Sequence, residues 1–216
     1  MRRVLLSLPL LTALGVSAQE SYVVSVVDLV PLGQDYAPVL VDSTVVMCSL
    51  RERDGMVSYR DATTEDPFSD LYAFTWDGER ASSPALLSER LSTPLNDGPA
   101  TFTMDGGTIC FTRNQSRSKG KTKKEDDRLG LFFSARIDGQ WTEPVPFDYN
   151  SAAYNVMHPA MSADGRFLYF ASDMPGGEGG TDLYFSELEP AGWSIPLNMG
   201  RVVNSEANEL FPTIAA

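Results

Sequence analysis

The sequence contains little of the chemistry that most enzymes need. His158 is its only histidine, and no Gly-x-Ser-x-Gly motif accompanies it, so a serine hydrolase is not indicated. One imidazole without an evident carboxylate or thiol partner makes no catalytic site, so we expect His158 to be an inter-strand or capping residue. The sequence therefore predicts no catalytic residue and no cofactor.

Metal-binding patterns are lacking as well. The acidic clusters at residues 64–70 (TEDPFSD) and 124–128 (KEDDR) lack the alternating acidic spacing around a central glycine that wraps calcium. Short acidic clusters of this kind are typical of solvated loops. We therefore expect no metal site.

The two cysteines, Cys48 and Cys110, are too few for a disulfide framework. Counted from the aspartates of the preceding turns, Cys48 follows Asp42 by six residues and Cys110 follows Asp105 by five, which predicts opposite faces of equivalent strands. An oxidising compartment could join them, but stacked sheets lie about 10 Å apart and a disulfide needs Cα atoms within about 7 Å. We expect the thiols to remain unbridged.

No hydrophobic run is long enough to span a bilayer. The longest, from Val4 to Val16, follows two arginines and precedes the small-x-small sequence Val16-Ser17-Ala18. This order is typical of a secretory signal peptide, which predicts cleavage after Ala18 and a mature chain from Gln19. No cysteine follows the apolar run, so a lipid anchor at the new N-terminus is not supported.

Basic residues are scarce. After removal of the first 18 residues, 15 basic and 29 acidic side chains give a net charge of −14. A chain of this charge is repelled by nucleic acid and by anionic lipid surfaces. The exception is residues 113–128 (RNQSRSKGKTKKEDDR), where seven of sixteen residues are Lys or Arg. This run fits a solvated loop, and docking on an anionic partner remains the alternative.

Three segments of the chain repeat one another. The segments SDLYAFTWDGERASSP, LGLFFSARIDGQWTEP and TDLYFSELEPAGWSIP end at Pro84, Pro144 and Pro196. Asp70, Gly130 and Asp182 each precede these prolines by 14 residues. Three matching segments with one internal spacing indicate an internal repeat.

The segments before them repeat too. Each has a proline, a short apolar run, a turn at Asp42-Ser43, Asp105-Gly106 or Asp164-Gly165, and a second apolar run. Asp-Gly between apolar runs is a strong hairpin signal. The anchoring prolines Pro38, Pro99, Pro159 and Pro212 are separated by 61, 60 and 53 residues. A fourth unit therefore begins near residue 208.

Each unit contains three clear strands and room for a fourth, near residues 85–87 or 145–147. Four-stranded units that repeat in this way are blades of a β-propeller, and the longer period follows from inserted loops. The second strands are apolar on both faces, as expected between neighbouring blades. We expect the inserts between the second and third strands, at residues 51–69, 113–128 and 174–181.

The last of these inserts is the glycine-rich sequence MPGGEGGTDLYF (residues 174–185). No Lys-Ser or Lys-Thr pair follows its glycines, as a phosphate-binding P-loop requires. The apolar run after them is short and aromatic, which favours a strand over a helix. We interpret the stretch as a connection between strands. The recurring Asp70 and Asp182 at strand starts are expected to bind backbone groups of these turns.

Residues 155–212 closely resemble the TolB-type, WD40-like β-propeller repeats of Gram-negative envelope proteins, in particular those found beside OmpA-like peptidoglycan-binding modules. The resemblance is clear but weaker over residues 35–144. The positions that match the family's marked residues include Asp164, Gly165, Tyr169, Phe170, Ser172, Gly179, Gly180, Asp182, Tyr184, Trp193 and Pro196. Trp141 takes the place of Trp193 in the second unit, and Ala81 takes it in the first.

The sequence therefore predicts an all-β protein: a TolB/WD40-like β-propeller segment of about three four-stranded blades plus the start of a fourth. The expected organisation is a signal peptide (1–18), a linker or strand (19–34) and blades at about 35–95, 96–154, 155–207 and from 208 onward. The expected repeat positions are Pro38, Asp70, Pro84, Pro99, Asp105, Trp141, Pro144, Pro159, Asp164, Gly165, Gly179, Gly180, Asp182, Tyr184, Trp193, Pro196 and Pro212.

The resemblance implies an exported, non-catalytic scaffold that binds other envelope proteins, such as peptidoglycan-associated, OmpA-like or secretion components, in the periplasm or at the outer membrane. The alternative is a carbohydrate-binding or enzyme-associated propeller. A glycan site would need aromatic platforms with carboxylates at one mouth, and the sequence places no such cluster. Three blades form an open arc, so self-association through blade edges is also expected.

Overall fold

The computed structural model describes residues 34–52, 60, 65–77, 80–115 and 128–214. The signal peptide and nearly all of the 19–34 linker, as well as most of the basic run, lie outside these residues. Within the described part the chain is all-β, with one short 3-10 turn, η1 (Glu89–Leu91), and no α-helix. The all-β prediction is confirmed.

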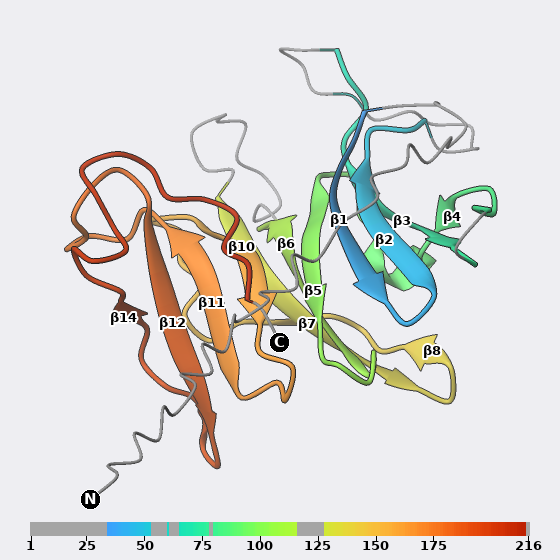
Figure 1. Ribbon diagram of the computed structural model, residues 1–216. Helices are drawn as coiled ribbons and strands as arrows, with labels where there is room; N and C mark the ends of the chain where they lie inside the picture. Colours follow the sequence, from blue (N-terminus) through green and yellow to red (C-terminus); the bar gives the residue numbers. More distant parts are fainter. Residues whose placement is uncertain (1–33, 53–59, 61–64, 78–79, 116–127, 215–216) are drawn as a thin grey trace, which may run out of the picture.

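The strands form three consecutive antiparallel sheets (Figure 1). The first contains β1 (Asp35–Val41), β2 (Thr44–Ser49), β3 (Asp70–Thr75) and β4 (Ala85–Leu86). The second contains β5 (Asp97–Phe102), β6 (Thr108–Asn114), β7 (Leu129–Ile137), β8 (Gln140–Trp141) and β9 (Val145–Pro146). The third contains β10 (Val156–Met161), β11 (Phe167–Ser172), β12 (Asp182–Glu189), β13 (Gly192–Trp193) and β14 (Leu197–Asn198). The long connection in each sheet precedes its third strand, as predicted.

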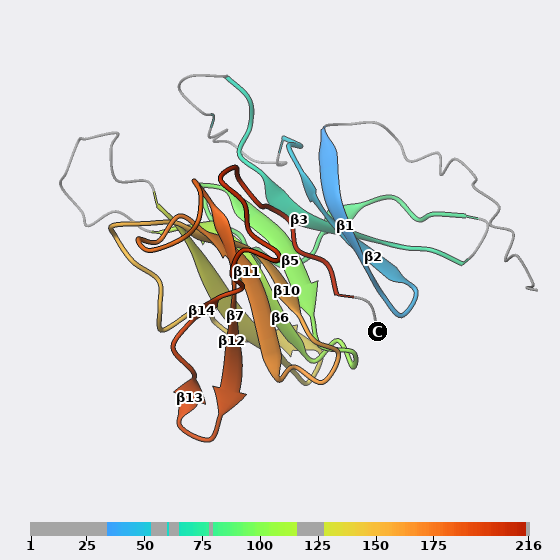
Figure 2. The same cartoon turned by 60° about the vertical axis from the view of Figure 1, so that its left-hand side comes forward.

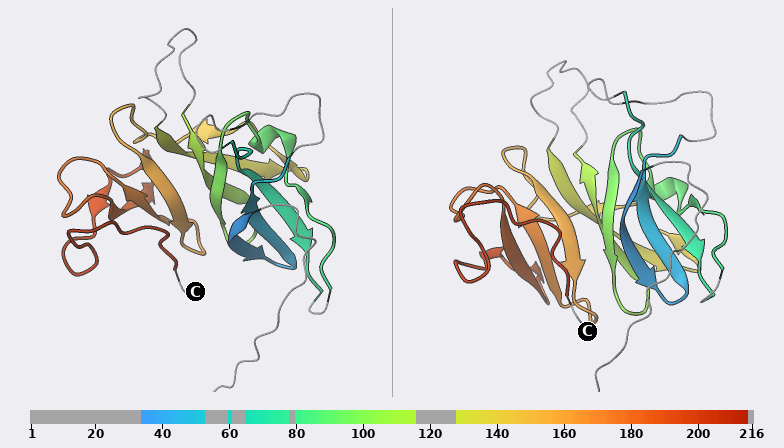
Figure 3. Two further views of the ribbon diagram at one scale, coloured as in Figure 1. Left: turned by 90° about the horizontal axis from the view of Figure 1, so that it is seen from above. Right: turned by 45° about the horizontal axis from the view of Figure 1, so that its top comes forward.

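The sheets stand side by side with their first strands gathered at one edge. Figure 2 shows β5 between β1 and β10, and β5 contacts both. Seen from above, the sheets spread from this inner edge like a fan (Figure 3). Consecutive antiparallel meanders of four or five strands with adjacent first strands are the arrangement of propeller blades, so the fold is propeller-like.

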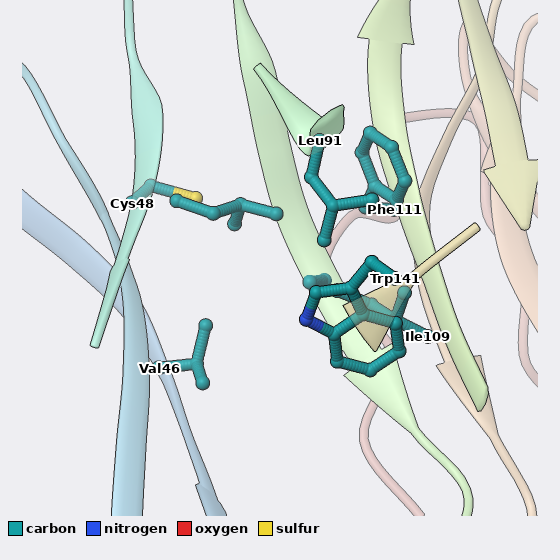
Figure 4. Packing of buried hydrophobic residues seen from close by; sticks show 8 residues of the cluster. Val46, Cys48, Leu91, Ile109, Phe111 and Trp141 are labelled. Atoms are coloured by element: carbon teal, nitrogen blue, oxygen red, sulfur yellow. The ribbon is translucent and has the colours of Figure 1, made fainter. Parts of the chain in front are cut away.

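The second strand of the middle sheet is buried on both faces. Ile109 and Phe111 point toward the first sheet. They share a core cluster with Val46 and Cys48 of that sheet, with Leu91 of η1 and with Trp141 of β8 (Figure 4). Cys110, between them in β6, belongs to the cluster formed with the third sheet. Alternate residues of one strand therefore serve two cores, as its uninterrupted apolar sequence predicts.

The expected placement of the cysteines on opposite faces is wrong. Cys48 lies in the core between the first and second sheets, and Cys110 lies in the core between the second and third. The two turns differ in length, because Val41 pairs with Thr44 in the first hairpin whereas Phe102 pairs with Ile109 in the second. Counting from the aspartates therefore gives the wrong relative face for Cys48 and Cys110. Both thiols are free, in agreement with the unbridged state.

The described chain ends beside the first strand of the third sheet. Asn208 forms a parallel bridge with Thr181, and the Glu209 amide donates to the Thr181 carbonyl at 2.8 Å. The equivalent contact begins β5, where the Asp97 amide donates to the Ser69 carbonyl at 2.8 Å. Residues 209–214 form no strand. They nevertheless lie where the first strand of a fourth sheet would begin.

Candidate functional site

The four anchoring prolines share an unusual backbone. Each follows a residue with positive φ: Ala37 (50°), Gly98 (103°), His158 (54°) and Phe211 (53°). A positive φ is uncommon outside glycine, and a following proline restricts the residue before it further. The pairing register of β1, β5 and β10 shifts at these points. Strained backbone repeated at equivalent positions marks a candidate site.

All of these residues except Gly98 line a cavity at the inner edge of the fan. It has a volume of about 420 Å³ and is bounded by the X-Pro segments of β1, β5, β10 and residues 211–214. A second cavity of about 720 Å³ continues toward the hairpin turns and shares Val39, Thr101, Met161 and Ile214 with the first. We call the two together the inner groove.

The wall of the inner groove is mostly apolar. Two of its large side chains are well exposed at the hairpin end, Leu40 (64%) and Met104 (72%). Ile214 and Phe211 are also exposed. An apolar concave surface with exposed side chains is typical of a binding site.

The hairpin end of the groove is acidic. Asp42 and Asp164 line it, and Asp105 lies in the turn that carries Met104. The Thr103 hydroxyl, 2.6 Å from Oδ1, lowers the pKa of Asp105, and the Ser162 hydroxyl does the same for Asp164. Both carboxylates are therefore ionised.

His158 lies at the bulge of β10 and contributes to the apolar end of the groove. Its ring stacks on Phe211, with centroids 3.8 Å apart, and its backbone amide donates to Thr112 Oγ1 at 3.0 Å. Burial lowers its pKa from 6.5 to about 4, so the ring is neutral at pH 7. Within the described residues its buried Nδ1 has no hydrogen-bond partner. The histidine thus works as an inter-strand residue, as expected, and in addition faces the groove.

The glycine-rich stretch connects β11 to β12 and binds an anion of its own chain. Asp182 accepts the backbone amides of Glu178 and Gly179, the latter at 3.1 Å, and the Asn198 Nδ2 amide at 2.7 Å. The carboxylate is 1% exposed. The expected side-chain to backbone contacts of Asp182 are therefore present, and the loop's amides face an internal carboxylate.

Close approach explains two of the glycines. A Cβ on Gly179 would lie 2.5 Å from the Ser205 carbonyl oxygen and would collide with that of Ala207, and one on Gly180 would collide with the Asn208 side chain. Both lie where the loop touches the segment leading to residues 208–214. These glycines fix the path of the chain toward the groove.

The remaining repeat residues have four roles. Pro84, Pro144 and Pro196 directly precede the outer strands β4, β9 and β14. Trp141 and Trp193 pack in the first and second inter-sheet cores, and the Tyr184 ring stacks on Phe170. Gly165 occupies the turn of the third hairpin with φ 70°. Asp70, which begins β3, is buried beside Ser92, whose hydroxyl contacts its Oδ1.

The groove residues Leu40, Met104, Phe211 and Ile214 were missed by sequence reasoning. The prolines were identified as equivalent anchors, but nothing in their spacing showed that they converge on one cavity. The available signal was Met104, an apolar residue directly before the turn aspartate in a place where polar residues are usual.

Within the described part of the chain, no three His, Cys, Asp or Glu side chains gather closely enough to hold a metal ion. The same residues include no helix that is long and apolar enough to cross a membrane.

Comparisons with known proteins give only distant similarity. No protein-family model matches the chain, and no curated protein sequence matches it. Among solved structures, a puromycin-hydrolyzing peptidase from Mycobacterium tuberculosis is 16% identical, with 81% of this chain and 24% of that chain covered and a TM-score of 0.48. Prolyl oligopeptidase B from Galerina marginata is 12% identical, with 81% and 23% covered and a TM-score of 0.42. A glycosyl hydrolase from Bacteroides ovatus is 15% identical, with 76% and 49% covered and a TM-score of 0.37. The chain spans about a quarter of either peptidase and half of the glycosyl hydrolase, and these similarities are too distant to assign an activity.

Proposed function

We propose that this chain is a non-catalytic binding module, built on a TolB-type propeller, that holds a segment of another protein in the inner groove. The observation that carries the proposal is the convergence of the four X-Pro segments, three of them with positive φ at a residue other than glycine, on one apolar cavity. A rigid, strained wall keeps a concave surface open without rearrangement, which lowers the cost of binding.

The partner class follows from the resemblance to envelope propellers. We propose export and a location in the periplasm or at the outer membrane, with peptidoglycan-associated, OmpA-like or secretion components as candidate partners. Expression in a Gram-negative host and N-terminal mass analysis test the export step. A mature chain starting at Gln19 is expected, and a cytoplasmic chain that retains Met1 would contradict it.

Binding to the groove is tested on two arrays, one of immobilised synthetic peptides and one of glycans. The Met104→Asp variant places a charge in the groove and should weaken peptide binding about tenfold, because an apolar side chain contributes on the order of 1.5 kcal/mol when buried. Ile195→Asp is the matched control, since Met104 and Ile195 are both 72% exposed but Ile195 lies away from the groove. Equal binding by the two variants would exclude the groove as the site.

A carbohydrate-binding or enzyme-associated propeller is the second candidate. It is favoured by Phe211, a half-exposed aromatic ring at the proline end of the groove, and by the carboxylates Asp42 and Asp164 at the hairpin end. An oligosaccharide that runs along the groove could stack one ring on Phe211 and donate hydroxyl hydrogen bonds to the carboxylates at the other end. Binding on the glycan array alone would establish this candidate in place of the first.

The proposal includes the absence of catalysis. Incubation with peptidase and glycosidase substrates is expected to give no turnover. A turnover that disappears in a folded His158→Ala variant would instead identify the chain as an enzyme.

A further inference from the structure

The inner groove combines an apolar wall with an anionic end, and this combination selects among partners. We infer that it binds an extended protein segment that lays apolar side chains along the X-Pro wall and places a Lys or Arg side chain among the hairpin turns. The inference rests on the proposed function, because it names the kind of segment that the groove would accept.

Each of the three sheets contributes one carboxylate to the hairpin end of the groove. Asp42, Asp105 and Asp164 belong to the first, second and third sheets and occupy the same turn between the first two strands. In Asp105 the turn hydrogen bonds from Thr103 and Gly107 both end on Oδ1, and in Asp164 those from Ser162 and Arg166 do the same. The second oxygen of each carboxylate is therefore not used by its turn.

Carboxylates outnumber cations at the hairpin end of the described groove. No Lys or Arg lines either of its cavities. The nearest cation in sequence is Arg166. It pairs with Glu187 of β12, with Nε 2.9 Å from Oε1, and its charge adds to the effect of the Ser162 hydroxyl in lowering the pKa of Asp164. Three carboxylates, with no cation among the described residues that line the groove, give this end a negative potential, which favours a cationic partner.

Exposed apolar side chains line the same cavity as two of these carboxylates, Asp42 and Asp164. Leu40 precedes Asp42 by two residues, and Met104 immediately precedes Asp105. Lys and Arg side chains pack their methylene stems on apolar surface while the charged end remains in polar surroundings. The turn region thus offers one surface for the stem and another for the charge, which neither a phosphate nor an acidic peptide would match.

The length of the groove fits a short extended segment. From the bulge at Ala37 to the turn at Asp42 the first strand advances five residues, about 16 Å at the rise of a β-strand. A bound strand would therefore place about five residues between its position at the prolines and its position at the turns. We expect recognition of an apolar stretch of four or five residues with a basic residue at one end.

The experiment uses acetylated and amidated, fluorescein-labelled peptides, so that terminal charges are absent. Each carries the same five alternating apolar and serine residues, preceded or followed by Lys, Ser or Glu. Fluorescence anisotropy with the full chain is measured at about 50 mM and about 500 mM salt. We expect the Lys peptide to bind about fivefold more tightly than the Ser peptide and the Glu peptide to bind most weakly, with smaller differences at high salt.

The matched variants change charge and keep the turns. Asn accepts the same turn hydrogen bonds as Asp and tolerates positive φ, so Asp42→Asn, Asp105→Asn and Asp164→Asn are combined in one protein. This triple variant should bind the three peptides equally, with the affinity of the wild type for the Ser peptide. Asp138→Asn is the control, because Asp138 is an exposed turn residue with φ 49° away from the groove. It should leave the preference for Lys unchanged.

Several results would overturn the inference. Equal binding of the Lys, Ser and Glu peptides, a preference that persists in the folded triple variant, or failure of every peptide to bind would each contradict it. If peptides bind equally but Met104→Asp still weakens them relative to Ile195→Asp, the proposed function stands and only the charge preference is wrong. If Met104→Asp binds the peptides as tightly as Ile195→Asp does, both the proposed function and the charge preference are wrong.

Discussion

Replacement of Asp182 by alanine tests whether an internal carboxylate organises the glycine-rich loop. The substitution removes the acceptor of the Glu178 and Gly179 amides and of the Asn198 side chain. Hydrogen bonds to a charged group contribute about 1.5–3 kcal/mol each. Water can reach part of the loop and replace some of them, so we expect a loss of about 3 kcal/mol in the free energy of unfolding.

The loss is measured by urea denaturation followed by tryptophan fluorescence. For a domain of this size it corresponds to a melting temperature lowered by about 6–12 °C. Glu189→Ala is the control, since Glu189 is an exposed residue at the end of the same strand, and it should change stability by less than about 0.5 kcal/mol. A loss below about 1 kcal/mol in Asp182→Ala would refute the reasoning, because three part-buried hydrogen bonds to a buried carboxylate should contribute more than that.

Three further predictions concern the groove wall, the glycine-rich loop and the cores. Because the pKa of His158 is lowered from 6.5 to about 4, the unfolded chain takes up this proton first, and stability should fall as pH decreases from 6.5 to 4. His158→Phe keeps a ring on Phe211 and should remove this fall in the free energy of unfolding between pH 6.5 and 4, measured by urea melts. A pH profile identical to that of the wild type would contradict a buried, neutral His158. Gly179→Ala should destabilise the protein by about 2 kcal/mol in the same melts, since its Cβ would meet the carbonyl of Ala207, and wild-type stability would mean that the loop does not approach so closely. Thiol titration of denatured, unreduced protein should find both Cys48 and Cys110 free, and near-zero thiol would show a bridge between cores that the structure keeps apart.

The sequence by itself determined the order of the strands and their grouping. The spacing from Asp182 to Pro196, and its two counterparts, located the third and outer strands of each sheet. The apolar sequence of residues 108–112 predicted burial on both faces, because alternate residues of a strand point to opposite sides and both kinds were apolar. These are local properties, which the order of residues determines directly.

Register could not be obtained in the same way. Cys48 and Cys110 were assigned to opposite faces because the turn aspartates were treated as equivalent, whereas the first hairpin has a shorter turn than the second. One residue more or less in a turn reverses the face of every residue that follows. Turn length depends on pairing across the hairpin, which the sequence pattern did not reveal.

The inner groove was decided by the tertiary structure alone. Pro38, Pro99, Pro159 and Pro212 lie more than 50 residues apart in sequence, and only the side-by-side packing of the sheets brings them to one cavity. The same packing places Leu40 and Met104 beside Asp42 and Asp164, although each hairpin by itself is an ordinary turn. Repeats in a sequence show which positions are equivalent, but the rotation from one sheet to the next determines where equivalent positions meet.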